Sequence, residues 1–275
     1  IRPHLSPDTG SADPGFQPIG FPSPTPQIIR DGPWVGSPVI QPYSFCGLAI
    51  DPQDKLYTVD GRNLQLLRLN KQGKIEKRLP LPEGFQGSRG CVAVDKDHIY
   101  LASRFGFLHI LDKEARELRK VELPYQPFGI ASDQKGYVLV LAPNQIDRIE
   151  IATGALQPMM EQRAESGVAR APFQAIAVTR SGEVLVNDLA NARVLRISPD
   201  GSTVLGQIGS AGSVNMGYLP GQFGSLGGLA LNGSDELFVA DWQLGVIQRF
   251  KTDGTLQAVI TAPGDALPIL TEENE

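Results

Sequence analysis

Short apolar runs alternate with turn-forming residues along most of this chain. Near its C-terminal end, three runs of strand length occupy residues 228–231, 237–240 and 246–250. A turn rich in Asn, Asp and Gly follows the first run at 232–235, and a turn with Asp and Gly follows the third run at 251–254. Runs of this length between such turns are typical of strands in an antiparallel meander. With a fourth run after the last turn, the pattern predicts a four-stranded sheet, the unit of a β-propeller.

The same unit is found five times. The residue that follows the first strand of each unit lies 38 to 53 residues after its counterpart in the unit before; these residues are Asp51, Asp95, Asp133, Thr179 and Asn232. Four short strands per period predict a propeller rather than a helical solenoid. The predicted fold is therefore an all-β propeller of four-stranded blades that spans residues 46–270.

Residues 1–45 differ from the rest because they hold ten of the 22 prolines. Proline lacks a backbone N–H and resists central strands, so we expect an extended arm. The arm is also rich in apolar residues, which indicates that it lies against the propeller or a partner. Residues 35–40 and 262–270 are expected to build a sixth blade that closes the ring, since an open ring leaves unpaired edges. Residues 271–275 are predicted to be an acidic tail.

The fourth and fifth units carry a specific resemblance. The segments that carry it are Gly206-Gln207-Ile208-Gly209, Pro220-Gly221-Gln222-Phe223 and Glu236-Leu237-Phe238-Val239-Ala240-Asp241. They resemble the glycine-rich turn and first strands of the NHL repeat, and the likeness covers about residues 46–260. It implies a six-bladed propeller. The scaffold hosts lyases, lactonase-like hydrolases, RNA binders, sensor domains and protein-interaction platforms, so the resemblance implies no single function.

The composition of the chain argues against nucleic-acid binding and membrane insertion. The net charge of −5 argues against a nucleic-acid surface, which needs clustered Lys and Arg. No apolar run reaches the roughly 20 residues of a membrane helix, so no membrane insertion is expected. Cys46 and Cys91 both begin a first strand. We interpret them as small buried residues, with a disulfide between them as the alternative.

One end of the predicted propeller is the candidate interaction face. The turns after the second strands and the connections between blades share this end, and loops on a rigid scaffold usually carry function. The candidate residues there are Arg62, Arg104, Phe105, Asn144, Asn191, Tyr218 and Trp242. Aromatic and Arg side chains are enriched in protein-binding hot spots. The alternative is that Trp242 and Phe105 pack between blades.

The mouth of the central channel offers little chemistry. The residues expected there are Phe45, Arg89, Phe128 and Gln174, a largely apolar ring. The three histidines, His4, His98 and His109, fall away from it. No metal cage and no nucleophile with an adjacent base is recognisable. We therefore predict no catalytic residue, no bound metal and no cofactor.

Aspartates recur at fixed places in the repeat. Asp51, Asp95 and Asp133 each begin the turn after a first strand, and Asp60, Asp188 and Asp241 each end a second strand. Such recurrence predicts turn capping, in which the carboxylate accepts backbone N–H groups. A calcium site is the alternative, but each turn supplies one carboxylate and calcium needs several oxygens.

These observations favour a non-catalytic propeller that binds protein, or serves as a structural module in a larger assembly. The arm followed by residues 47–51 (GLAID) is similar to propellers attached to phage-tail-like particles. One alternative is a metal-dependent lyase or lactonase-like hydrolase with its site at the channel. Another is an extracellular ligand-sensing domain. A cytoplasmic or particle-associated location is expected, with secretion or the periplasm as the alternative, and the sequence fixes no oligomeric state.

Overall fold

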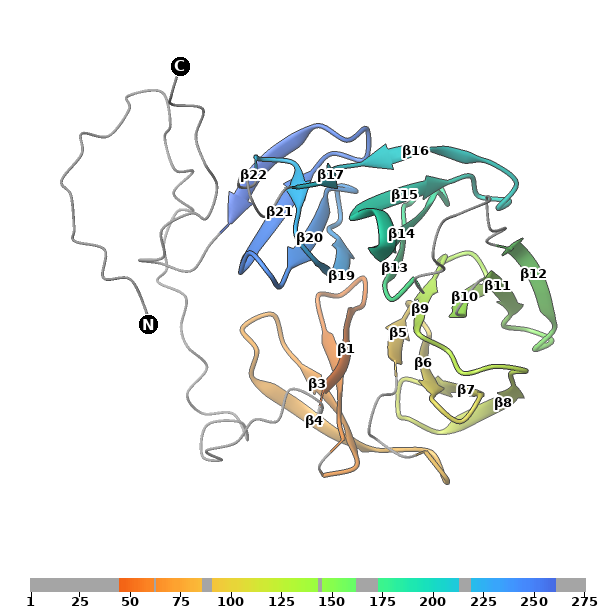
Figure 1. The fold of residues 1–275 in the computed structure, drawn as a ribbon. Helices are drawn as coiled ribbons and strands as arrows, with labels where there is room; N and C mark the ends of the chain where they lie inside the picture. The colour runs from red at the N-terminus through yellow and green to blue at the C-terminus, as the bar shows by residue number, and fades with distance from the viewer. Residues whose placement is uncertain are drawn as a thin grey trace, which may run out of the picture.

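The computed structural model describes residues 45–61, 63–85, 91–142, 145–161, 173–212 and 219–260. They form five four-stranded antiparallel sheets, which Figure 1 shows arranged around a common centre. Within each sheet, the strands follow one another in sequence order from the centre outward. The chain is a β-propeller.

The blades are numbered here in chain order. Blade 1 holds β1 (Phe45–Ile50), β2 (Leu56–Asp60), β3 (Gln65–Leu69) and β4 (Ile75–Pro80). Blade 2 holds β5 (Cys91–Val94), β6 (His98–Ser103), β7 (Phe107–Asp112) and β8 (Glu117–Glu122). Blade 3 holds β9 (Gly129–Ser132), β10 (Tyr137–Ala142), β11 (Gln145–Glu150) and β12 (Leu156–Glu161).

Blade 4 holds β13 (Ile176–Val178), β14 (Val184–Asp188), β15 (Arg193–Ile197) and β16 (Val204–Ile208), and η1 (Leu189–Asn191), a single turn of 3-10 helix, follows β14. Blade 5 holds β19 (Leu226–Leu231), β20 (Leu237–Asp241), β21 (Val246–Phe250) and β22 (Leu256–Ile260). Between these blades, β17 (Ser210–Ala211) and β18 (Gln222–Phe223) form a short parallel pair. Among the described residues, no helix has the length and apolar character needed to cross a membrane.

Blades stack face to face, which explains why their middle strands are continuous apolar runs rather than alternating ones. All five residues of β14 are buried, because blades 3 and 5 cover its two faces. The outer strand β8 is exposed at five of its six residues, and it is correspondingly rich in charge. Within a blade, the middle strands are therefore buried and apolar, and the outer strand is exposed and charged.

The hydrophobic core lies between blades. Four clusters of buried side chains join blades 1 and 2, 2 and 3, 3 and 4, and 4 and 5. Tyr57, Leu66, Ile99 and Leu101, for example, meet between blades 1 and 2 and are at most 1% exposed. Each cluster draws on strands about 40 residues apart in sequence, so adjacent blades stabilise one another.

The turns between first and second strands confirm the predicted capping by aspartate. Asp51 Oδ1 accepts the N–H groups of Gln53 and Lys55, each at 3.0 Å. Asp133 makes the same pair of bonds with Lys135 and Tyr137 in blade 3, and Asp95 accepts the N–H groups of Asp97 and His98 in the shorter turn of blade 2. The Oδ1 atoms of these carboxylates therefore satisfy backbone N–H groups within their own turns.

The described residues contain five blades rather than the six expected. Inner strands contact one another from β1 through β5, β9 and β13 to β19, but β19 and β1 share no contact of that extent. The predicted arm comprised residues 1–45, of which Phe45 instead begins β1. The rest of the arm, the tail and the segments expected to form a sixth blade lie outside the described residues. The ring of described blades is thus open between blades 5 and 1.

Candidate functional site

The two ends of the propeller carry different turns. We call the end with the turns that follow the second strands the upper face, and the end with the turns that follow the first strands the lower face. The connections between successive blades also belong to the upper face. Those of the predicted interaction and channel-mouth residues that the structure describes map to it.

The turn between β6 and β7 presents Arg104 and Phe105 to solvent. Phe105 is 47% exposed, although it is a large apolar side chain, and Arg104 is exposed beside it. The guanidinium of Arg104 lies 4.9 Å from the centre of the Phe105 ring, which holds the two side chains together as a cation–π pair. Ser103 Oγ accepts the Phe105 N–H at 3.2 Å and fixes the turn. The pair is an organised surface feature with no described residue packed over it.

Trp242 is the most exposed large hydrophobic side chain among the described residues, at 72%. It follows β20 directly, at the edge of the open ring. Asn191, also predicted as a contact residue, instead donates its side-chain N–H to Asp188 Oδ2 at 2.8 Å, so its amide is used within the turn. The other three predicted contact residues, Arg62, Asn144 and Tyr218, lie outside the described residues.

The channel mouth is only partly described. Phe128 is half-buried, and its N–H bonds to the carbonyl of Leu141 at 2.8 Å. Gln174 is exposed, and its backbone N–H donates to Asn187 Oδ1 at 2.8 Å. Phe45 lies in β1, and Arg89 falls outside the described residues. Among the described residues of the predicted mouth, Gln174 thus supplies an exposed side-chain amide, and none of them is charged.

Aspartates at the ends of second strands hold the upper-face connections. Asp241, 1% exposed, accepts four backbone N–H groups, from Gly224, Ser225, Gln243 and Leu244, at 2.6 to 3.1 Å. In blade 4 the carboxylate of Asp188 binds Arg193 Nε at 2.8 Å in addition to Asn191. These contacts confirm turn chemistry at Asp188 and Asp241. Among the described residues, no group of three His, Cys, Asp or Glu side chains is placed to hold a metal ion.

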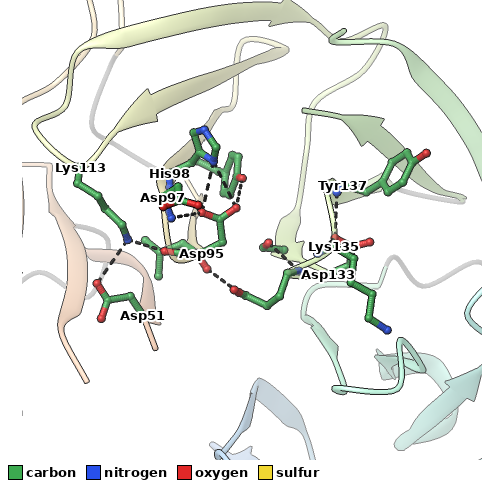
Figure 2. Close-up of polar contacts among 12 residues, drawn as sticks. Asp51, Asp95, Asp97, His98, Lys113, Asp133, Lys135 and Tyr137 are labelled. Atoms are coloured by element: carbon green, nitrogen blue, oxygen red, sulfur yellow. Dashed lines mark hydrogen bonds and ion pairs between the residues drawn. The ribbon is translucent and has the colours of Figure 1, made fainter. Parts of the chain in front are cut away.

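The lower face carries a polar network that the sequence did not reveal. Figure 2 shows Lys113, from the turn between β7 and β8, reaching across to Asp51 of blade 1. Its ammonium lies 3.4 Å from Asp51 Oδ2, donates to the carbonyl of Asp95 at 2.5 Å, and sits 4.9 Å from the Tyr57 ring centre. Burial lowers the pKa of Lys113, and burial together with Asp51 raises the pKa of Tyr57 to about 12.

Similar contacts link the remaining blades at this end. Gln134 Nε2 donates to the carbonyl of Val94 at 3.0 Å, and Lys135 Nζ donates to the carbonyl of Ser181 at 3.2 Å. An open groove of about 700 Å³ runs between blades 2 and 3 beside these contacts, lined by mixed charges that include Lys96, Asp97 and Arg119. The contacts of the lower face thus join neighbouring blades, and titratable side chains that include Asp95 and His98 line the groove beside them.

The two described histidines are used within blades. His98 Nδ1 lies 3.4 Å from Asp95 Oδ1, in the lower-face turn of blade 2 (Figure 2). His109 is 1% exposed in β7, with Nδ1 2.7 Å from Glu117 Oε2 and its ring edge-on to Phe85. Neither histidine adjoins a Ser or Cys nucleophile in the described contacts, so neither is placed as a catalytic base.

Burial lowers the pKa of His109, with Glu117 acting in the opposite direction. An unfolded histidine binds a proton near pH 6.5, whereas the folded site resists protonation. Stability should therefore fall as the pH drops from 7.5 through 6.5 to 5.5, by at most about 1.4 kcal/mol per pH unit from this one group. Urea unfolding at these three pH values measures the slope. His109→Gln should flatten it, and an unchanged slope in that variant would assign the effect elsewhere.

Comparison with known proteins supports the fold. No protein-family model matches the chain, and no curated protein matches it. A solved streptogramin B lyase aligns with a TM-score of 0.57 at 16% identity, over 84% of this chain and 72% of the lyase. A catalytically inactive virginiamycin B lyase from Staphylococcus aureus with quinupristin gives 0.58 at 16%, over 81% and 71%. A protein of unknown function from Bacteroides caccae gives 0.51 at 19%, over 72% and 69%.

These solved structures are β-propellers at identities that show the fold alone. Membership of the NHL family is not shown by them. The likeness supports the β-propeller fold, and it leaves the chemistry of the site to be argued from this chain's own residues.

Proposed function

We propose that this chain is a non-catalytic propeller that binds a protein partner through its upper face, as a module of a larger assembly. The observation that carries the proposal is the solvent-exposed Arg104–Phe105 pair. A Phe ring held 47% exposed by an ordered turn costs solvation free energy in the isolated molecule. That cost is recovered when a partner covers the ring.

The chemistry of the pair indicates the partner. Phe105 fits an apolar pocket, and Arg104 beside it favours a carboxylate on the pocket's rim. Among the described residues, no acidic side chain pairs with Arg104, so its charge is available to a partner. We favour a protein surface with an apolar pocket flanked by Asp or Glu. A phage-tail-like particle is the assembly that the likeness of residues 47–51 supports.

A matched pair of substitutions tests this proposal. Leu205, on outer strand β16, is 47% exposed like Phe105 but lies away from the upper face. Cross-linking in the source cells followed by mass spectrometry identifies the partner, and titration with the purified partner then gives a dissociation constant. Phe105→Ala should raise that constant about tenfold or more, and Leu205→Ala should leave it unchanged.

Equal constants for the two variants, or a chain that cross-links to no protein, would refute the partner-binding role. The alternative with a specific observation in its favour is a metal-dependent lyase, because two of the similar solved structures are lyases. Elemental analysis of the purified full chain separates the two proposals. Stoichiometric zinc or calcium would favour the lyase.

A further inference from the structure

An arginine recurs at one place on the third strands, near the lower face. The register of the sheets identifies this place in every blade, because an alanine of the first strand pairs with a residue of the second, which pairs with the residue in question. In blade 2 that residue is Ile110. In the other four described blades it is an arginine: Arg68, Arg148, Arg196 and Arg249.

Each of these arginines lies beside an oxygen acceptor of its own blade. Arg196 Nε donates to Glu183 Oε1 at 2.5 Å, and Arg148 Nε donates to Gln157 Oε1 at 2.9 Å. In blades 1 and 5, the arginine has a nitrogen 3.8 or 3.9 Å from a glutamate oxygen. This place in the blade therefore accommodates a guanidinium group in four of the five described repeats.

Blade 2 lacks the arginine, and the space beside it is large. Between blades 3 and 4, Arg148 lines a cavity of about 90 Å³ at the turn after the first strand. The groove between blades 2 and 3 has the same place in its repeat, but Ile110 lines it and its volume is about 700 Å³. The shorter isoleucine contributes to this difference. The groove falls within the range of about 300–1,000 Å³ that is common for ligand sites.

The charges along the groove differ in how far the protein itself engages them. Arg119 donates to two carbonyl groups of blade 3, and Lys135 is directed to a carbonyl group of blade 4 (Figure 2). Asp97 and Glu150 line opposite walls, and among the described residues neither forms an ion pair, although Glu150 accepts one hydroxyl group. Lys96 is exposed, with no partner among the described residues. Two carboxylates and one lysine are thus left for a ligand, which favours a cation.

Apolar side chains lie beside these charges. Leu118, at the bulge of β8, is 57% exposed in the groove. Ile151 and the ring of Tyr137 are half-buried on the blade 3 wall. An aliphatic or aromatic stem that covers Leu118 removes apolar surface from water, which stabilises the complex.

We propose that the groove between blades 2 and 3 binds a guanidinium or amidinium group on an apolar stem, in the place that an arginine fills in the other described blades. The cation lies between Asp97 and Glu150, and the stem lies against Leu118. A small molecule and an arginine side chain of a protein both supply this chemistry. The inference goes beyond the proposed function, because the groove is on the lower face and does not involve Phe105, so the two proposals can fail separately.

Fluorescence titration of the purified full chain with para-aminobenzamidine tests the proposal, since this amidinium on an aromatic ring brightens when it leaves water. Ile110→Arg supplies the missing side chain and should raise the dissociation constant about tenfold or more. Asp97→Asn combined with Glu150→Gln should raise it about tenfold, because the attraction of two carboxylates is lost. Asp54→Asn is the control: Asp54 is exposed like Asp97, but it lies in the lower-face turn of blade 1, and its loss should leave the constant unchanged.

Competition fixes the sign of the charge and the source of the ligand. Benzamidine should displace the probe, and benzoate, which has the same shape and the opposite charge, should not. Displacement by both, or an unchanged constant in the double variant, would overturn the proposal. The double variant decides alone if Ile110→Arg prevents folding, because neither of its side chains is buried. Agmatine as the tighter competitor assigns the groove to a small molecule, and an acetylated Leu-Arg-Leu amide as the tighter one assigns it to a protein arginine.

Discussion

Replacing Asp241 with Ala will lower the free energy of unfolding by about 3–5 kcal/mol. The carboxylate is 1% exposed and accepts four backbone N–H groups, two from the connection that precedes blade 5 and two from the turn after β20. Alanine leaves these donors without an acceptor at a site that water reaches poorly. Each unsatisfied buried donor costs about 1–3 kcal/mol, and partial relaxation reduces the total. Urea denaturation of the purified chain measures the change.

Asp253→Ala is the matched control for this prediction. Asp253 also caps a turn, accepting the Thr255 N–H at 2.8 Å, but it is exposed and serves that one backbone donor. Its loss should cost no more than about 1 kcal/mol, because water replaces the carboxylate. If the two variants unfolded at the same urea concentration, the four buried hydrogen bonds of Asp241 would contribute no more stability than the single exposed one of Asp253. Asp241 would then not hold the upper-face connections in place.

The aspartates show how far the sequence predicts this molecule. Recurrence at one place in the repeat was enough to predict that Asp188 and Asp241 act in turns. The same recurrence did not distinguish them, although Asp188 binds two side chains and Asp241 four backbone groups. The bonds from Gly224 and Ser225 depend on how an irregular connection folds back over β20. A strand pattern carries no information about that path.

The candidate site was also predicted only in part. Its location on turns followed from the repeat, which placed Arg104 and Phe105 where the structure has them. Lys113 was missed because its partner, Asp51, is 62 residues away in another blade. Pairing across blades depends on the rotation between neighbouring sheets, which local sequence does not encode. Asn191 was proposed for contact with a partner, but its neighbour Asp188 is close enough to bind its amide first.

Blade number was the other feature that local patterns left undetermined. Five units are visible because each encodes all four strands consecutively, whereas the strands expected for a sixth are split between the ends of the chain. In the described propeller, Leu48 of β1 is 62% exposed and Ile247 of β21 is 41% exposed, so blades 1 and 5 carry exposed apolar side chains. The repeat pattern did not predict that exposure, because the same kinds of residue are buried between blades elsewhere in the propeller.

Gly209→Ala will destabilise the propeller by about 2–5 kcal/mol. Gly209 has φ of +71°, and a Cβ built there would lie 2.1 Å from Cε2 of Phe223, which is 1% exposed in the cluster between blades 4 and 5. Gly245→Ala is the control, since Gly245 has φ of +68° but no atom within 4 Å of its added Cβ. It should cost only about 1 kcal/mol, for the backbone. The difference between the two in urea unfolding isolates the packing of Phe223; equal costs would mean that the ring moves aside freely and that this interface is looser than its burial indicates.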